Sequence, residues 1–134
     1  MRRLRTRAQF QAALSAVTVA RTAHFALHRC ALAAPAAAGA VAQHPPLFQP
    51  ADDAWVGAMV PKRWARRAVT RNAIRRQIYA LAEGAALPQA AHVVRLRAGF
   101  DRSRFVSASS DALKHAVRAE LQQLFARAAR AGAP

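Results

Sequence analysis

Residues 71–79 hold a group of phosphate-binding side chains with the spacing to share one side of a helix. At about 3.6 residues per turn, five of them fall within a sector of roughly 140°: Arg71, Asn72, Arg75, Arg76 and Tyr79. Guanidinium groups bind phosphate oxygens in pairs, an amide reads a sugar or base edge, and a phenol offers a stacking plane. Like charges four residues apart repel, and no acidic residue lies between Asp53 and Glu83 to relieve them. The pattern therefore favours an RNA- or DNA-binding face over a merely solvated one.

The acidic residues suggest no catalytic arrangement. There are six, scattered along the chain: Asp52, Asp53, Glu83, Asp101, Asp111 and Glu120. Only Asp52 and Asp53 adjoin, whereas general acid–base or two-metal chemistry needs carboxylates that converge. The five histidines and the single cysteine lack metal-ligand spacing, and no phosphate-loop or nucleophile-elbow motif is present. We expect no catalytic residue and no metal site in the protein itself.

The net charge points to a polyanionic partner. Lysine and arginine total 21 against 6 acidic residues, which gives a charge of +15 and a pI of about 12.0. Nucleic acid fits this charge best, and an anionic membrane surface is second. No apolar run approaches the roughly 20 residues that span a bilayer, so no membrane partner is expected. One cysteine is typical of a reducing compartment, which predicts a cytoplasmic protein.

The helix that carries the basic sector is predicted over 68–83, with Ile74, Ile78 and Leu81 facing the core. A capping box at Thr6 and Gln9 predicts a helix over about 6–15, and apolar periodicity predicts another over 110–130. Strands are expected at 17–19, 24–32, 55–60 and 92–97. Residues 33–50 are rich in Ala and Pro and short of large side chains to bury, which indicates a flexible insert. The whole chain, 1–134, is then one α+β domain, a two-layer α/β sandwich.

The N-terminal 34 residues allow a second interpretation. They contain arginine and alanine and no acidic residue, a composition similar to that of an organellar transit peptide. A folded helix that carries a basic cluster is the alternative, and the capping box favours it.

One stretch resembles a known family. An apolar strand with Val56 and Gly57, the sequence Pro61-Lys62-Arg63, and the run RRAVTRNAIRR at 66–76 are similar to the protein component of bacterial ribonuclease P. The similarity extends over nearly the whole chain except the insert. It implies a four-stranded sheet with three helices, in the order helix, three strands, helix, strand, helix, and an uncommon left-handed crossover.

The resemblance also implies a function. The chain would be the protein subunit of ribonuclease P, which assists removal of the 5′ leader from precursor tRNA. Catalysis would belong to the RNA subunit, which would hold the Mg²⁺. The expected partners are that catalytic RNA, with one protein per RNA, and precursor tRNA.

Two sets of site residues follow from the resemblance. The set expected to bind the RNA subunit is Lys62, Arg63, Arg66, Arg67, Arg71, Asn72, Arg75 and Arg76. The set expected to line a cleft for the single-stranded leader is Phe10, Leu14, His28 and Lys62.

The chain departs from the family pattern at several of these positions. Ala73 replaces an arginine, Tyr79 stands where the family usually has another, and His28 replaces a frequent tyrosine. The helix loses cations at Ala73 and Tyr79, so its RNA contact is expected to be weaker.

Other functions share some of these features. A structural RNA-binding protein of the ribosomal type would use the same charged helix without any role in tRNA processing. A helix-turn-helix DNA-binding module conflicts with the strands at 24–32 and 55–60, and a cationic membrane-active protein conflicts with the even distribution of apolar stripes.

Overall fold

The computed structural model describes residues 1–32, 47–100 and 111–131. Within them lie five strands and three helices. In chain order they are β1 (Arg2–Arg3), α1 (Arg7–Leu14), β2 (Val17–Arg21), β3 (Phe25–Cys30), β4 (Trp55–Met59), α2 (Ala68–Gly84), β5 (Ala91–Leu96) and α3 (Asp111–Ala131).

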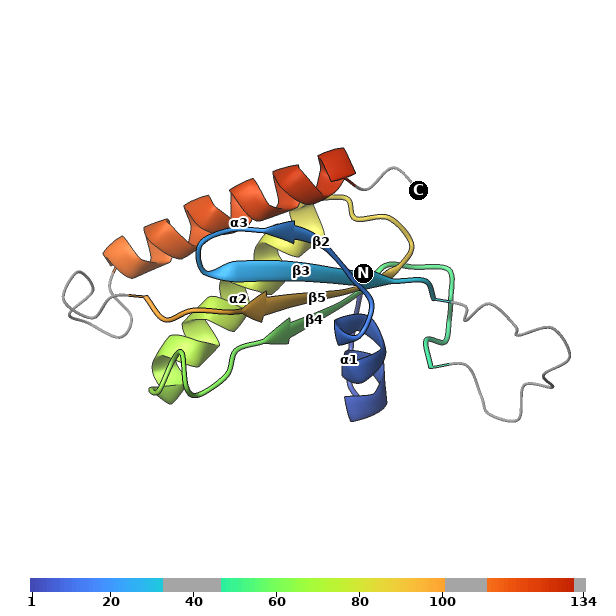
Figure 1. Cartoon of the computed structure of the whole chain (residues 1–134), viewed down its shortest axis with the longest axis horizontal. Coiled ribbons are helices and arrows are strands. Elements are labelled where there is room, and N and C mark those ends of the chain that lie inside the picture. The colour runs from blue at the N-terminus through green and yellow to red at the C-terminus, as the bar shows by residue number, and fades with distance from the viewer. Residues whose placement is uncertain (33–46, 101–110, 132–134) are drawn as a thin grey trace, which may run out of the picture.

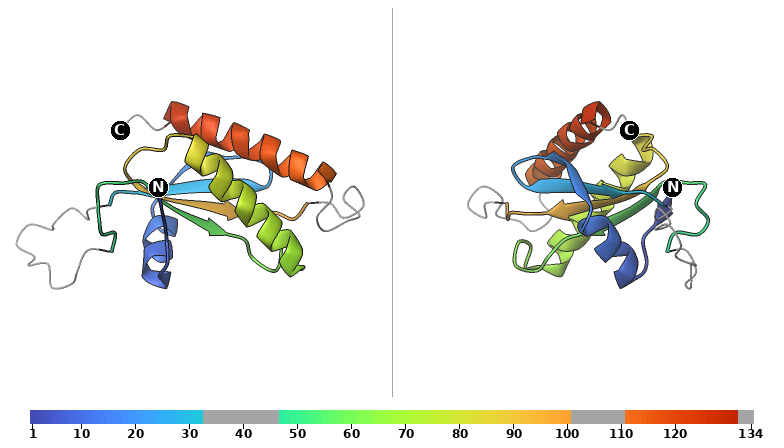
Figure 2. Two further views of the ribbon diagram at one scale, coloured as in Figure 1. Left: turned by 180° about the vertical axis from the view of Figure 1, so that it is seen from behind. Right: turned by 45° about the vertical axis from the view of Figure 1, so that its right-hand side comes forward.

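The strands form one mixed sheet in the order β1-β4-β5-β3-β2. Figure 1 shows β4, β5, β3 and β2 side by side in this order. The pairs β1–β4 and β4–β5 are parallel, whereas β5–β3 and β3–β2 are antiparallel. Seen from behind in Figure 2, α2 lies in front of the sheet, β4 lies below β5, and both strands run to the right. The connection from β4 through α2 to β5 is therefore left-handed, against the usual right-handed rule. The fold class and this crossover are confirmed.

The helices cover both faces of the sheet, and alternating side chains serve two cores (Figure 2). Val94 and Leu96 of β5 pack with α2 and α3. Val93, on the opposite face of the same strand, packs with the elements around α1. The short α1 begins with the predicted capping box, in which the Gln9 backbone N–H donates to Thr6 Oγ1 at 3.2 Å.

Gly57 sets the distance between α1 and the sheet. A Cβ atom at this position would lie 2.6 Å from the Phe10 ring and 2.8 Å from Leu4 Cδ1. Only glycine allows the Phe10 ring to lie directly on the β4 backbone, so α1 can rest closely on this end of the sheet.

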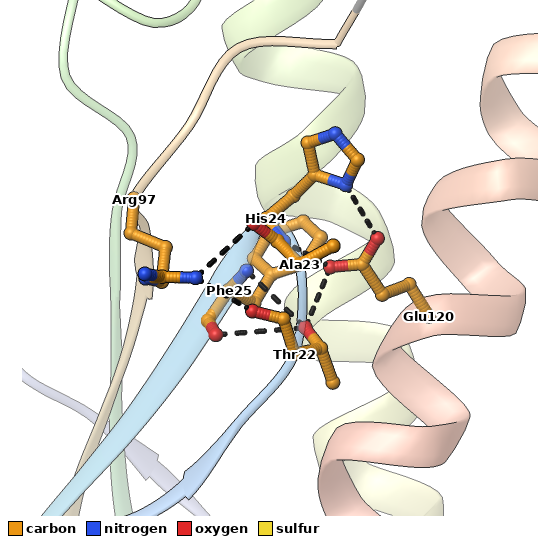
Figure 3. Close-up of polar contacts among 6 residues, drawn as sticks. All are labelled: Thr22, Ala23, His24, Phe25, Arg97 and Glu120. Carbon is orange, nitrogen blue, oxygen red and sulfur yellow. Dashed lines mark hydrogen bonds and ion pairs between the residues drawn. The ribbon is translucent and has the colours of Figure 1, made fainter.

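Glu120 on α3 fixes the turn between β2 and β3 (Figure 3). Its carboxylate accepts hydrogen bonds from Thr22 Oγ1 at 2.6 Å, from the His24 backbone N–H at 2.7 Å and from His24 Nδ1 at 2.6 Å. Arg97, which follows β5, donates to the Thr22 and Ala23 carbonyls at 2.9 and 3.2 Å. We call these residues the Glu120 hub; it joins β2, β3, α3 and the chain after β5.

One detail of the predicted fold was wrong. The sheet has five strands rather than four, because Arg2–Arg3 adds a two-residue strand beside β4. Such a segment is too short to show the alternation that identifies a strand. Most of the insert predicted at 33–50 lies outside the described residues, at 33–46. In its described part, Phe48 is buried against Trp55, with ring centroids 5.9 Å apart. A single aromatic among prolines carries no periodic signal that predicts burial.

Candidate nucleic-acid interface

The first predicted set is a contiguous stretch that we call the basic surface. It comprises the turn after β4 and the first half of α2: Lys62, Arg63, Arg66, Arg67, Arg71, Asn72, Arg75 and Arg76. All of these except Arg71 are exposed. On the other side of α2, Ile74 and Ile78 are buried against the sheet and α3, as the apolar stripe predicts. At the C-terminal end of the stripe the fully buried residue is Ala82, whereas the predicted Leu81 is only half-buried.

The turn that carries Lys62 and Arg63 is held by its own backbone. The N–H groups of Trp64 and Ala65 both donate to the Pro61 carbonyl at 3.1 Å. Arg71 Nη1 then donates to the Ala65 carbonyl at 3.0 Å and to the Arg66 carbonyl at 2.8 Å. Arg71 therefore braces the loop that leads into α2, a role that its place in the motif does not show.

The start of α2 is strongly positive. The N-cap, Arg67, makes no side-chain cap bond, and the first turn contains no acidic residue. The helix dipole adds partial positive charge at this end, where a carboxylate is ordinarily favoured. Here arginines stand where a carboxylate is usual, so the positive potential at the start of α2 is high. An anionic ligand bound there would lower this potential.

An aromatic ring lies within this positive region. The side chain of Trp64 is 37% exposed, and the Arg63 guanidinium lies 5.2 Å from the centre of its ring. The basic surface and Trp64 together thus offer guanidinium groups, an amide and an accessible aromatic ring, which are the side chains that bind phosphates, sugars and bases.

The second predicted set lies on the other face of the sheet. Phe10 and Leu14 of α1 are half-buried there, and Phe10 rests on Gly57. The strand registers place Gly57, Val93 and His28 in one row, so His28 is two strands, or about 10 Å, from Gly57. Lys62 is the one member of this set that lies in the turn after β4 rather than on α1 or β3.

His28 is enclosed rather than presented as a stacking plane. Its side chain is 6% exposed. Arg95 Nε donates to His28 Nε2 at 3.3 Å, so the ring proton sits on Nδ1 and donates to Thr18 Oγ1 at 3.1 Å. Burial, with the charges of Arg95 and Arg21, lowers the pKa of His28, which favours this neutral form.

Arg95 is a candidate binding residue that the sequence did not single out. It is half-exposed, it lies two positions after Val93 on the α1 side of the sheet, and His28 orients its guanidinium. Its position two residues after Val93, on the same face of β5, was the signal available in the sequence.

The described residues gather no oxygen ligands for Mg²⁺. Of the six carboxylates, Asp101 is not described, Glu120 bonds to the β2–β3 turn, and Asp53 accepts from the Ala54 N–H and the N-terminal amine. Nowhere in the described part do three histidine, cysteine or acidic side chains meet as metal ligands. The donors of the described residues therefore do not fit a magnesium site.

Comparison with known proteins decides the family. The sequence profile of the family described as Ribonuclease P matches residues 1–129. The chain belongs to the ribonuclease P protein family. Family membership links it to tRNA processing and to a ribonucleoprotein nuclease, as the resemblance predicted.

Individual relatives agree with this assignment. The chain is 44% identical over 87 residues to the ribonuclease P protein components of Bordetella parapertussis and Bordetella bronchiseptica, covering 60% of this chain and 67% of each relative. The fold is similar to that of the Staphylococcus aureus RNase P protein, with a TM-score of 0.61, 16% identity and 94% of each chain covered.

A membrane-spanning helix is not found in this ribonuclease P protein within the ranges 1–32, 47–100 and 111–131. Its three helices are instead amphipathic, with the apolar side on the sheet.

Proposed function

We propose that this chain is the protein subunit of ribonuclease P and that it binds two RNAs with the two faces of its sheet. The basic surface on α2 would bind the catalytic RNA subunit, one protein per RNA. The face beside α1 would bind the 5′ leader of precursor tRNA. The observation that carries the proposal is the exposed, carboxylate-free basic surface within a chain of this family.

The chemistry is assigned to the RNA partner. The RNA subunit would hold the Mg²⁺ that activates water for cleavage of the leader. The described side chains of the protein bind and orient instead: guanidinium groups neutralise phosphates that would otherwise repel one another where two RNAs meet. Lys62 belongs to both predicted sets, and it is an exposed residue of the turn after β4.

Reconstitution tests the function directly. The protein is added to the ribonuclease P RNA of the same genome and a precursor tRNA with a 5′ leader, at low Mg²⁺. We expect leader cleavage to rise well above the rate of the RNA alone, because added cations substitute for Mg²⁺ in screening phosphates. No stimulation, together with binding to ribosomal RNA, would support the structural RNA-binding alternative.

Salt dependence tests the basic surface. Arg75→Ala and Arg76→Ala should each reduce the slope of log affinity for the RNA subunit against log salt by about 0.7–0.9, the loss of one phosphate contact. Arg71→Ala should weaken binding further, because it also frees the loop at Ala65 and Arg66.

The matched control is Arg118→Ala, which removes an exposed arginine from α3. This variant should keep the wild-type slope. If the Arg75 and Arg76 variants also keep it, the RNA subunit does not contact these residues.

The ratio of precursor to mature tRNA affinity tests the leader face. Arg95→Ala should lower this ratio by about 10- to 150-fold, since a hydrogen bond to a charged group contributes about 1.5–3 kcal/mol. Phe10→Ala should also lower it, but with a loss of fold stability, because its ring packs on Gly57. His28→Ala should also lower the ratio, because His28 orients the Arg95 guanidinium.

The ratio is measured by equilibrium binding beside a thermal unfolding curve for each variant. Mature tRNA has no leader, so its affinity should stay close to wild type. An unchanged ratio in stable Arg95 and His28 variants would place the leader elsewhere on the protein.

A further inference from the structure

The N-terminal strand brings an arginine to the far end of the basic surface. In β1, the Arg2 N–H donates to the Ala54 carbonyl at 2.8 Å, and the Leu4 N–H donates to the Val56 carbonyl at 2.9 Å. Arg3 lies between these bonds and pairs with Val56, whose side chain packs on the α2 side of the sheet. The Arg3 guanidinium carbon is 4.1 Å from the centre of the Tyr79 ring.

Tyr79 is itself firmly placed. Its hydroxyl accepts a hydrogen bond from the Ala58 N–H of β4 at 3.1 Å, and its ring packs partly into the core. It follows Arg75 by one helical turn, or about 6 Å, on the same outer sector of α2. A guanidinium over the Tyr79 ring therefore continues the row of Arg75 and Arg76 by one further position.

The contact does not neutralise Arg3. The ring attracts the cation but carries no net charge. The ion pairs of the described residues involve only Asp53 and Glu120, and neither includes Arg3. The side chain is exposed, so its outer N–H groups are available to an anion.

We propose that Arg3, held over the ring of Tyr79, is a phosphate-binding residue of the basic surface and supplies from β1 a cation that α2 lacks at position 79. This inference rests on the proposed binding of the RNA subunit by α2. Arg3 would touch the RNA, and Tyr79 would be a positioning residue.

The test compares salt slopes for binding to the ribonuclease P RNA. Arg3→Ala should lower the slope by about 0.7–0.9, so that its loss of affinity between about 50 and 200 mM salt is roughly threefold smaller than that of wild type. Tyr79→Leu should lower the slope equally, and the double variant should lower it no further, because both changes remove one contact.

Two variants separate positioning from folding. Tyr79→Phe keeps the ring but loses the hydroxyl that Ala58 uses, so it should lower the melting temperature and keep the wild-type slope. Tyr79→Arg in the Arg3→Ala background places a guanidinium on α2 itself and should restore the slope.

The outcomes are distinct. If Arg75→Ala and Arg76→Ala reduce the slope and Arg3→Ala does not, the Arg3 contact is only structural and this proposal is overturned, while the proposed function stands. If none of the three reduces it, the basic surface is not the RNA contact. A lower slope in Tyr79→Phe would also contradict the positioning role.

Discussion

Replacing Glu120 by alanine should lower the free energy of unfolding by about 3–5 kcal/mol, because this half-buried carboxylate accepts three hydrogen bonds and each bond to a charged group contributes about 1.5–3 kcal/mol before the remaining groups regain water. The substitution leaves Thr22 Oγ1 and the His24 N–H without their acceptor. It also releases the β2–β3 turn from α3, two elements almost a hundred residues apart in the chain. The expected loss is a large share of the stability of a domain of this size.

The measurement is denaturant unfolding followed by circular dichroism. Glu120→Gln should lose less than Glu120→Ala, because it keeps one acceptor oxygen. Glu83→Ala, at an exposed position on α2, serves as the control and should change stability by less than about 0.5 kcal/mol. Equal stability of the two alanine variants would show that the Glu120 hub contributes nothing.

Acidification should destabilise the fold through His92. Burial lowers the pKa of His92 from 6.5 to about 4, although its hydrogen bond to the Pro88 carbonyl opposes the shift. Its Nδ1 accepts from Arg29 Nε at 3.2 Å, so the folded protein holds the neutral ring. In the unfolded chain the His92 ring binds a proton as the pH falls through about 6.5, whereas in the folded protein it binds one only near pH 4.

The contribution of neutral His92 to the free energy of unfolding is therefore fully present above about pH 6.5. It falls by about 3 kcal/mol as the pH drops to 4. The lowered pKa of His28 acts in the same direction. Unfolding of wild type and His92→Gln at a series of pH values measures the effect. The variant should lose much of the acid dependence, and His115→Gln, an exposed change on α3, should keep it. Parallel pH profiles for wild type and His92→Gln would contradict the assignment.

Local patterns in the sequence predicted most of the architecture. The capping box at Thr6, the apolar stripe at Ile74 and Ile78, and the alternation around Val93 each depend on neighbours within a few residues. The spacing of apolar residues within such short stretches differs between helices and strands, so it indicates which element forms. The same periodicity predicted the exposed side of α2, because residues outside the apolar stripe of a helix face the solvent.

The parts that were missed depend on pairing between distant segments. No local pattern connects Arg3 with Tyr79, or Arg95 with His28, because those contacts arise only after β1 pairs with β4 and β3 with β5. Tyr79 looked like a lost cation for this reason. Arg71 looked like a phosphate ligand, although two of its hydrogen bonds go to carbonyls five and six residues earlier.

The pairing of β1 with β4 also sets an order of events during synthesis. Residues 2–4 leave the ribosome before their hydrogen-bond partners at 54–56 and before the ring at position 79 on which Arg3 rests. Translation at about 5–20 residues per second separates these events by several seconds. The nascent chain thus carries its N-terminal arginines unplaced until α2 has emerged, and an RNA that needs the complete surface can be captured only late in translation.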